Sequence, residues 1–499
     1  MKNKFLLAVI MIFTILMTAC SSAGHISTYT ISLDTIPKNF DPQVATNQNE
    51  LLVLTNIFDG LVEYRDGRIE NNVAESYTIS PDGRTYTFKL KKNSTFYLSK
   101  KQQIPVTSDD FAFALERIVS PDTHSPYYED FKHITSIETP DDSTLIIKLD
   151  KADSNFLSKL AMPAAFPCNR EFFKQSKGAY GLNVKNILSN GPYTINYLAD
   201  DDSYITMIRV VESKNAIDRI RISLKGEESY DKLYNDDKIS GFFAENEKQQ
   251  NISGTVHSYE NSHLNLTFNL QNPILQNQNI RSAFSYFAYA MQNSGANPDA
   301  VSPTYSIFTN AVTFGDTTIT QAVSPTTPLY MNANPKELIT QGMAEAGISK
   351  LEGLKVLIPS DNKYSVIMEN INQFWQKELG VFLTLEFVPT QEIEQRVRKG
   401  DYDIAFVNYV PQANDPLLFI EPYAQYDTAI TDIVNKIKES SNHDVIISNI
   451  KSAQDIVLNK AYVAPMCSSI STYYHKNYFT NVDVNPFGNI VNLKYAKAK

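Results

Sequence analysis

Tryptophan and cysteine are scarce in this chain. Its 499 residues include one tryptophan, Trp375, and three cysteines, Cys20, Cys168 and Cys467. At most one disulfide bond can join the two cysteines that follow Cys20, so disulfides do not define the fold. Cys168 and Cys467 either pair outside the cell or remain two buried thiols, and both alternatives stay open.

Long apolar runs are also missing, except at the N-terminus. Phe5 to Ala19 carry no charge, but these 15 residues are too few for a transmembrane helix, which needs about 20. Lys2 and Lys4 precede the run. A basic start followed by a short apolar segment is typical of a secretory signal peptide, which we assign to residues 1–19.

The signal peptide ends in a sequence that resembles the bacterial lipobox. Residues 16–20 read LMTAC, with small residues before Cys20. The resemblance implies cleavage before Cys20 and a diacylglyceryl group on its thiol, whereas the alternative is an ordinary signal peptide with an incidental cysteine. Two or more acyl chains hold a protein firmly on a membrane. We therefore expect residues 20–27 to be a flexible leash at the outer face of the cytoplasmic membrane.

Motifs of enzymes and metal sites are absent as well. The sequence has no GxSxG, HExxH or CxxC motif, no phosphate-binding P-loop, and no GxGxxG after a strand. We therefore expect no enzymatic activity, no cofactor and no metal. His257 and His263 flank Glu260, but six residues of extended chain span roughly 20 Å, so we interpret them as solvent-exposed. A formal net charge of −10 argues against nucleic acid as a partner.

The length and the patterning predict an α/β protein of more than one lobe. After cleavage about 480 residues remain, more than one hydrophobic core normally serves. Residues 28–33 form an expected strand, residues 76–90 a hairpin around Pro81-Asp82-Gly83, and Thr107 to Asp110 the cap of a helix over 111–119.

The second half of the chain alternates strands and helices. The predicted strands are 354–358, 381–387 and 402–409, and the predicted helices between them are 364–379 and 391–399. This order predicts a lobe with a mostly parallel sheet.

Nine short motifs, spread over almost the whole mature chain, carry a family resemblance. In chain order they are Asn39–Pro42, Asn56–Leu61, Val73–Leu90, Pro105–Pro121, Ser189–Tyr193, Asn279–Phe284, Ala344–Gly347, Gly400–Ala405 and Asn414–Pro416. Together they resemble the bacterial extracellular solute-binding proteins of family 5, which include oligopeptide-, dipeptide- and nickel-binding receptors. Residues 117–134 resemble the oligopeptide receptors in particular.

The resemblance implies a type II (cluster C) periplasmic-binding-protein fold, with two lobes, a hinge of crossing strands and an inserted third subdomain. On this basis we expect residues 28–58, 190–283 and 480–499 in lobe I, residues 59–189 in the inserted subdomain, and residues 284–479 in lobe II.

The function implied by the resemblance is that of a monomeric receptor of an ABC importer. Such a receptor captures a peptide by lobe closure and passes it to the permease subunits. The alternative is the same fold and transport role with another small ligand, such as a metal chelate or a sugar.

By family position, three segments of the chain line the pocket. The expected ligand-binding residues are Thr46, Asn47 and Gln48 on one wall, Tyr127 on the opposite side, and Tyr409, Gln412, Asn414 and Asp415 on the floor.

Two floor positions depart from the family pattern. Tyr409 stands where many peptide receptors carry tryptophan, and Gln412 where the oligopeptide receptors carry the acid that binds the peptide α-ammonium. A neutral amide does not compensate a buried ammonium. Either Asp415 takes this role or the ligand presents no free amine there. Alternatively, Asp415 only caps the turn before Pro416.

Overall fold

The structure is a computed structural model that describes residues 27–499, apart from 66–67, 100–101, 154, 245–251, 293–300, 315–316, 361–364, 412 and 441. The expected signal peptide, Cys20 and Gln412 lie outside these residues. Within the described chain, no helix is long and apolar enough to cross a membrane.

The first lobe is built on a four-stranded sheet. Its strands in spatial order are β1 (Thr28–Leu33), β12 (Arg219–Leu224), β11 (Tyr204–Arg209) and β10 (Tyr193–Leu198), of which β1 and β12 are parallel. Helix α2 (Gln48–Ile57) packs against β10. The end of the chain returns to this lobe, through β22 (Phe479–Thr480), β23 (Asp483–Asn485), β24 (Ile490–Asn492) and β25 (Lys497–Ala498).

The inserted part contains a second four-stranded sheet, covered by α3 (Ser108–Val119). Its strands in order are β4 (Ala74–Ile79), β5 (Thr85–Leu90), β9 (Thr144–Leu149) and β8 (Ile134–Asp141). Alternate residues of β5 and β9 point into one core, as expected for strands with one buried face. The predicted hairpin is confirmed by β4 and β5, and the predicted cap by the capping box of Thr107 and Asp110.

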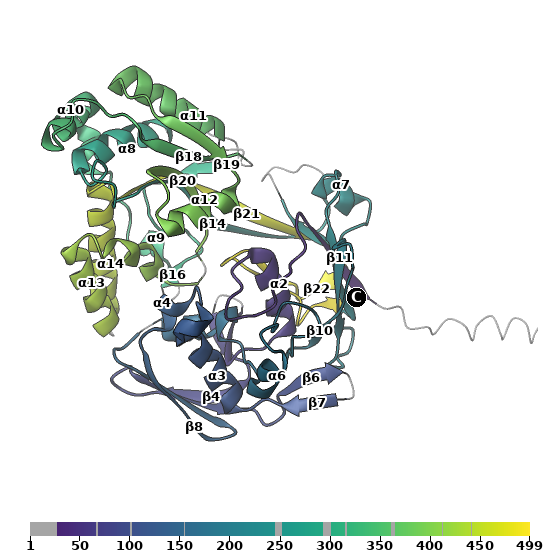
Figure 1. The fold of residues 1–499 in the computed structure, drawn as a ribbon. Helices are drawn as coiled ribbons and strands as arrows, with labels where there is room; N and C mark the ends of the chain where they lie inside the picture. The colour runs from purple at the N-terminus through teal and green to yellow at the C-terminus, as the bar shows by residue number, and fades with distance from the viewer. Residues whose placement is uncertain are drawn as a thin grey trace, which may run out of the picture.

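Smaller elements complete the inserted part and the first lobe. They are β2 (Val62–Arg65), β3 (Arg68–Asn71), β6 (Thr95–Ser99), β7 (Gln102–Pro105), α4 (Tyr128–Phe131), α5 (Phe156–Leu160), α6 (Arg170–Gln175) and α7 (Tyr230–Asn235). Figure 1 shows the inserted part below α2 and the first-lobe sheet to its right.

The second lobe surrounds a seven-stranded sheet. Its path runs β13 (Gly241–Phe243), β21 (Val463–His475), β14 (Thr255–Phe268), β20 (Ile404–Tyr409), β18 (Lys355–Pro359) and β19 (Thr384–Val388), with β15 (Val301–Pro303) beside β21. Only β19, β18 and β20 are parallel neighbours, and the other pairs are antiparallel. The prediction of a mostly parallel sheet is therefore right for the alternating unit and wrong for the whole sheet.

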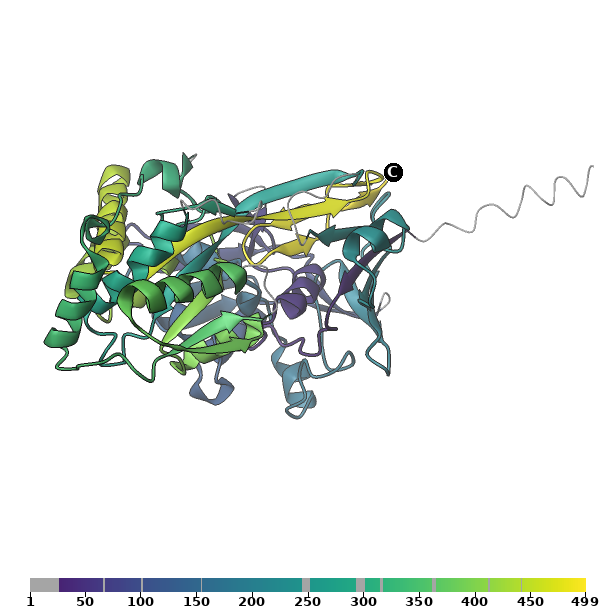
Figure 2. The same cartoon turned by 90° about the horizontal axis from the view of Figure 1, so that it is seen from above.

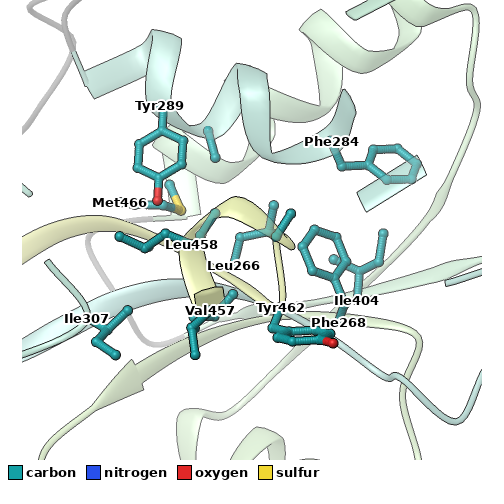
Figure 3. Close-up of a cluster of buried hydrophobic side chains, with 14 of the residues drawn as sticks. Leu266, Phe268, Phe284, Tyr289, Ile307, Ile404, Val457, Leu458, Tyr462 and Met466 are labelled. Atoms are coloured by element: carbon teal, nitrogen blue, oxygen red, sulfur yellow. The ribbon is translucent and has the colours of Figure 1, made fainter. Parts of the chain in front are cut away.

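Helices pack against this sheet, and helices and strands together form the hydrophobic core of the second lobe. They are α8 (Gln278–Gln292), α10 (Pro335–Glu345), α11 (Ser365–Phe374), α12 (Thr390–Lys399), α13 (Thr428–Glu439) and α14 (His443–Asn459). Figure 3 shows Phe284 and Tyr289 of α8 over Leu266 of β14, with Met466 of β21 and Leu458 of α14 beside them.

Two long strands join the lobes. Strands β14 and β21, of 14 and 13 residues, pair along most of their length and pass from one lobe to the other (Figure 2). At one end, Leu266 and Met466 belong to the second-lobe core. At the other end, Tyr473 packs in the first-lobe core, where its hydroxyl lies 2.9 Å from that of Tyr29.

The hydrophobic clusters suggest a boundary that differs from the expected one. Residues of 264–283 pack in the second-lobe cluster, although we expected 190–283 in the first lobe. Because β14 runs through both lobes without a break, no single residue ends the first lobe there. The division into lobe I, inserted subdomain and lobe II stays a prediction.

Cysteine and histidine burial resolves one alternative and corrects one expectation. Cys168 and Cys467 are both buried free thiols. We expected His263 to be exposed to solvent, but it is only 1% accessible, because it lies in the part of β14 that is covered on both sides by neighbouring strands. Burial lowers the pKa of His263 to about 3. His257 is half-buried, and its Nε2 atom lies 3.2 Å from Nε2 of His475.

Candidate functional site

A cavity lies where the first lobe, the inserted part and the second lobe meet. It encloses about 790 Å³, including space open to solvent. The first lobe contributes Leu51 and Thr55 of α2 and, from the chain's end, Asn485, Phe487, Ile490, Asn492 and Lys494. The inserted part contributes Glu63, Tyr64, Ile69, Tyr127, Ser158, Ala161, Met162, Pro163 and Phe166, and the second lobe Ala413 and Asn414.

The charged groups at this cavity are paired with one another. Lys494 is 6% exposed, and its ammonium lies 2.9 Å from the Asp59 carboxylate and 3.2 Å from that of Glu63. Burial alone lowers the pKa of Lys494, but the two carboxylates outweigh burial and raise it, so the ammonium stays charged. Tyr495 donates a 2.5 Å hydrogen bond to Glu63. What remains for a ligand is mainly apolar surface with neutral amides.

Of the three residues expected on the first wall, Asn47 and Gln48 make hydrogen bonds at the start of α2. Asn47 caps the helix, because its Oδ1 accepts a 2.9 Å hydrogen bond from Asn49 N. Gln48 donates a 2.5 Å hydrogen bond to Gly488 O, and Thr46 is exposed. None of them is among the cavity-lining residues, whereas Leu51 and Thr55, farther along the helix, are.

Tyr127 lines the cavity but does not lie opposite the first wall. Its hydroxyl donates a 2.5 Å hydrogen bond to the carbonyl of Ala45, one residue before Thr46. Ser125 likewise donates to Gln43 O at 2.7 Å. Residues 125–127 therefore satisfy the backbone carbonyls of the turn that precedes α2, which places Tyr127 beside that wall.

The turn itself is fixed by a buried ion pair that sequence reasoning did not assign. Arg117 of α3 lies 2.5 Å from Asp41, both are under a tenth exposed, and Arg117 also donates to Gln43. Opposite, Gly181 has a φ of +73°, and a Cβ there would stand 2.3 Å from Asp41 N. The inserted part thus holds the turn from two sides.

Of the residues expected on the floor, Asn414 lines the cavity and Tyr409 does not. Asn414 accepts from Thr313 N at 2.8 Å and donates to Thr313 Oγ1 at 2.9 Å, so both ends of its amide are engaged. Tyr409, at the end of β20, meets Phe419 edge to face at 5.0 Å, and burial raises its pKa.

Asp415 caps the 3₁₀ turn Pro416–Phe419, accepting a 2.7 Å hydrogen bond from Leu417 N. This is the capping geometry that the sequence left open as an alternative. The carboxylate is 4% exposed, and burial raises the pKa of Asp415 to about 7, although the Leu417 bond and Lys159 act against the rise. Asp415 is not among the cavity-lining residues.

Charged groups of the inserted part face this floor. Lys159 of α5 pairs with Asp153 at 2.9 Å and influences Asp415 across the cleft. Burial, together with Glu421 of the second lobe, raises the pKa of Asp130. Among the described residues, no group of three His, Cys, Asp or Glu side chains is placed to hold a metal ion.

Comparisons with known proteins agree with this two-lobed arrangement. Residues 68–429 match the family model described as bacterial extracellular solute-binding proteins, family 5 (middle region). The dipeptide-binding protein DppE of Bacillus subtilis is 22% identical and aligns with 92% of this chain and 90% of its own length. The oligopeptide-binding protein OppA of the same organism is 22% identical and aligns with 93% of this chain and 94% of its own length. Both relatives are binding proteins rather than enzymes.

Solved structures share the fold. Listeria monocytogenes OppA bound to peptide superposes with a TM-score of 0.77 at 22% identity, over 96% of this chain and all of that one. Burkholderia pseudomallei OppA superposes with a TM-score of 0.78 at 18% identity, over 95% of this chain and 99% of that one. The chain therefore has the type II periplasmic-binding-protein fold, and the fold expected from the motifs is confirmed.

Proposed function

Because the chain belongs to the bacterial extracellular solute-binding proteins of family 5, we propose that it captures peptides between its lobes and delivers them to the permease of an ABC importer. The observation that carries this proposal is the cavity to which both lobes contribute, lined by apolar side chains and neutral amides. Relatives named for dipeptide and oligopeptide binding support the choice of ligand.

Binding acts through closure of the lobes. A ligand that touches both lobes binds the closed state more tightly than the open one, so it shifts the hinge equilibrium toward closure. Strands β14 and β21 are the connection that bends. The closed form is the shape that the permease reads, and no chemical step is required. We expect the receptor to act as a monomer.

Two asparagines supply donors for the backbone of a peptide. Asn485 and Asn492 line the cavity, and each uses its Oδ1 to accept a bond from Phe487 N or Lys494 N. In the described chain their Nδ2 groups make no hydrogen bond, so they are available to peptide carbonyls. The apolar surface of Tyr64, Phe487 and Ile490 then accommodates side chains.

Mass spectrometry of ligand released from the purified, unfolded protein tests the ligand class. We expect peptides, and we expect refolded protein to bind a synthetic copy of the released peptide in calorimetry. Release of a sugar or a metal chelate, without measurable peptide binding, would overturn the peptide assignment and leave the transport role with the alternative ligand.

Asp415 is buried directly after the cavity-lining Asn414 and does not itself line the cavity, and it is the carboxylate that we propose for the peptide ammonium. Replacing it in Asp415→Asn keeps the cap, since asparagine caps as well as aspartate. Losing a charge-assisted bond should lower affinity for free peptides by ~1.5–3 kcal/mol, and acetylated peptides should bind both proteins alike. Asp201→Asn, on an exposed turn, is the control. Equal binding of free and acetylated peptides by the wild type would contradict the role.

The N-terminal lipid is the proposed tether. The lipobox at residues 16–20 supports it. Cys20→Ala should abolish incorporation of labelled palmitate and release the protein from the membrane fraction, whereas Cys168→Ala should leave both unchanged. A Cys20→Ala protein that still carries label would refute the anchor.

A further inference from the structure

The crossing strands carry a histidine pair that the proposed function does not use. His257 of β14 and His475 of β21 are diagonal neighbours on one face of the sheet, because His475 is opposite Thr255 and His257 is opposite Tyr473. Their Nε2 atoms are 3.2 Å apart, and their ring centroids 5.3 Å. The fold thus pairs His257 with His475, not with His263, its neighbour in sequence.

The spacing of the two nitrogens suits two ligands of one metal ion. Imidazole nitrogens bind zinc at about 2.0–2.1 Å. Two such bonds to atoms 3.2 Å apart enclose an angle of roughly 100–105°, between the octahedral and the tetrahedral value. The separation of the two Nε2 atoms is therefore one that two ligands of a single ion can have.

One ring is already oriented as in metal sites. Nδ1 of His475 lies 3.1 Å from Lys476 O, and since a carbonyl only accepts, Nδ1 carries the proton. Nε2 of His475 is then the unprotonated nitrogen and accepts a hydrogen bond from Nε2–H of His257, so a bound ion takes the place of that proton. Metal-bound histidines commonly donate their other ring N–H to a carbonyl in this way, which fixes the tautomer and the ring orientation.

Space for the remaining coordination positions lies on the His257 side. His257 lines a hollow of about 1240 Å³, including space open to solvent, together with Tyr64, Tyr259 and Asp483. His475 itself is 2% exposed, so an ion reaches the pair through this hollow. Two protein nitrogens with water in the other positions make a site for an exchangeable ion, not a buried structural one.

We propose that His257 and His475 bind a divalent first-row transition metal, such as Zn²⁺ or Ni²⁺, at the crossing strands. Imidazole is a ligand that these ions favour over magnesium and calcium. A bound ion links β14 to β21 and stiffens the connection that bends when the lobes close. The hollow adjoins the peptide cavity, because Tyr64 lines both, but neither histidine lines the peptide cavity. The metal site therefore does not depend on which ligand is transported.

Calorimetric titration of the tag-free, chelator-treated protein with ZnCl₂ tests the site. The wild type should bind one Zn²⁺ per chain, and His257→Gln and His475→Gln should each weaken binding at least tenfold. His443→Gln, which removes an exposed histidine of α14, should bind like the wild type. CoCl₂ should give a visible absorption band in the wild type that both pair variants lose.

Thermal unfolding separates loss of the site from loss of the fold. ZnCl₂ should raise the melting temperature of the wild type and of His443→Gln, but not that of His257→Gln. Because His257 is half-exposed, its variant is expected to fold even if His475→Gln does not. No heat of binding at millimolar ZnCl₂, or His257→Gln binding zinc as tightly as the wild type, would overturn the proposal.

Discussion

At the scale of single residues, Asp415 combines a backbone cap with a buried charge. Its carboxylate accepts from Leu417 N, yet it is 4% exposed, and within the described chain no cation forms an ion pair with it. The nearby Lys159 is instead paired with Asp153. Such a group favours the protonated form in the folded protein, which makes stability depend on pH.

The sign of this dependence follows from the two pKa values. The pKa of Asp415 is about 7 when folded and ~3.9 when unfolded. Between these values the folded state binds more protons, so the contribution to stability is lost as pH rises from about 4 to 7. Asp415→Asn keeps the cap without titrating. We expect the variant to gain up to about 4 kcal/mol relative to the wild type between pH 4 and pH 8.

Urea unfolding of both proteins across this range measures the difference. Other titrating groups affect both proteins alike and cancel in the comparison. Parallel curves of unfolding free energy against pH would show that Asp415 titrates near its ordinary pKa in the folded protein.

Gly181 is the second residue with a testable role. Its φ of +73° is strained for other residues, and a Cβ would collide with the backbone of Asp41 in the turn before α2. Gly178 also has a positive φ, +85°, but nothing lies within 4 Å of a Cβ built there. Comparing substitutions at the two glycines therefore separates the cost of backbone strain from the cost of the close contact with Asp41.

Gly178→Ala should cost about 1–2 kcal/mol, the strain of the left-handed conformation alone. Gly181→Ala should cost clearly more, because the turn held by Arg117 must also move. Urea unfolding measures both. Equal losses of unfolding free energy in the two variants would mean that the close contact between Gly181 and Asp41 does not affect stability.

At the scale of elements, the irregularity of β14 connects the crossing strands to the cavity. The register with β21 shifts between Glu260 and Ser262, which leaves Asn261 as the bulged residue. Its fully buried amide donates to Pro486 O and to Asn489 Oδ1, both at 2.6 Å. The bulge thereby holds residues 486–489, which include the cavity-lining Phe487.

Asn261→Ala should therefore lower stability by about 1–3 kcal/mol, because buried acceptors lose their donor. It should also weaken ligand binding, since the segment around Phe487 is no longer held. Asn449→Ala, at a half-buried position of α14 whose side chain bonds only to Val445 O of the same helix, is the control and should cost less. Denaturant unfolding and ligand titration together measure the effect, and unchanged affinity in Asn261→Ala would contradict the link to the cavity.

At the scale of the whole molecule, the lobes meet through charges as well as through the cavity. Lys159 of the inserted part and Asp415 of the second lobe influence each other's pKa, and Glu421 of the second lobe helps to raise the pKa of Asp130 of the inserted part. These groups are brought together only when the two parts approach. We therefore predict that closure of the lobes changes the solvation of these groups and the pKa of Asp415.

Small-angle X-ray scattering should show that saturating peptide reduces the radius of gyration, because the liganded lobes close. The melting temperature should rise with peptide concentration, corresponding to about 2.7 kcal/mol at a hundredfold excess over Kd. A peptide of scrambled sequence that shows no binding in calorimetry is the control. Stabilisation without compaction would argue for a cavity that binds without lobe closure.

Short-range features of the fold were determined by the sequence itself. The hairpin around Pro81-Asp82-Gly83, the capping box of Thr107 and the parallel unit of β18, β19 and β20 were predicted where they occur. Each depends on turn chemistry or periodicity within a few tens of residues, and those are properties that a local pattern expresses. The order of the nine motifs identified the family in the same way.

Tertiary structure alone decided which distant residues became neighbours. It placed Tyr127 beside Ala45 rather than across the cleft, Lys494 between Asp59 and Glu63, and His257 against His475. The partners in these contacts are 82 to more than 400 residues apart along the chain. Such contacts arise because the chain leaves the first lobe, builds the second and returns, and a repeat of 2 or 3.6 residues carries no information about where the returning segment docks.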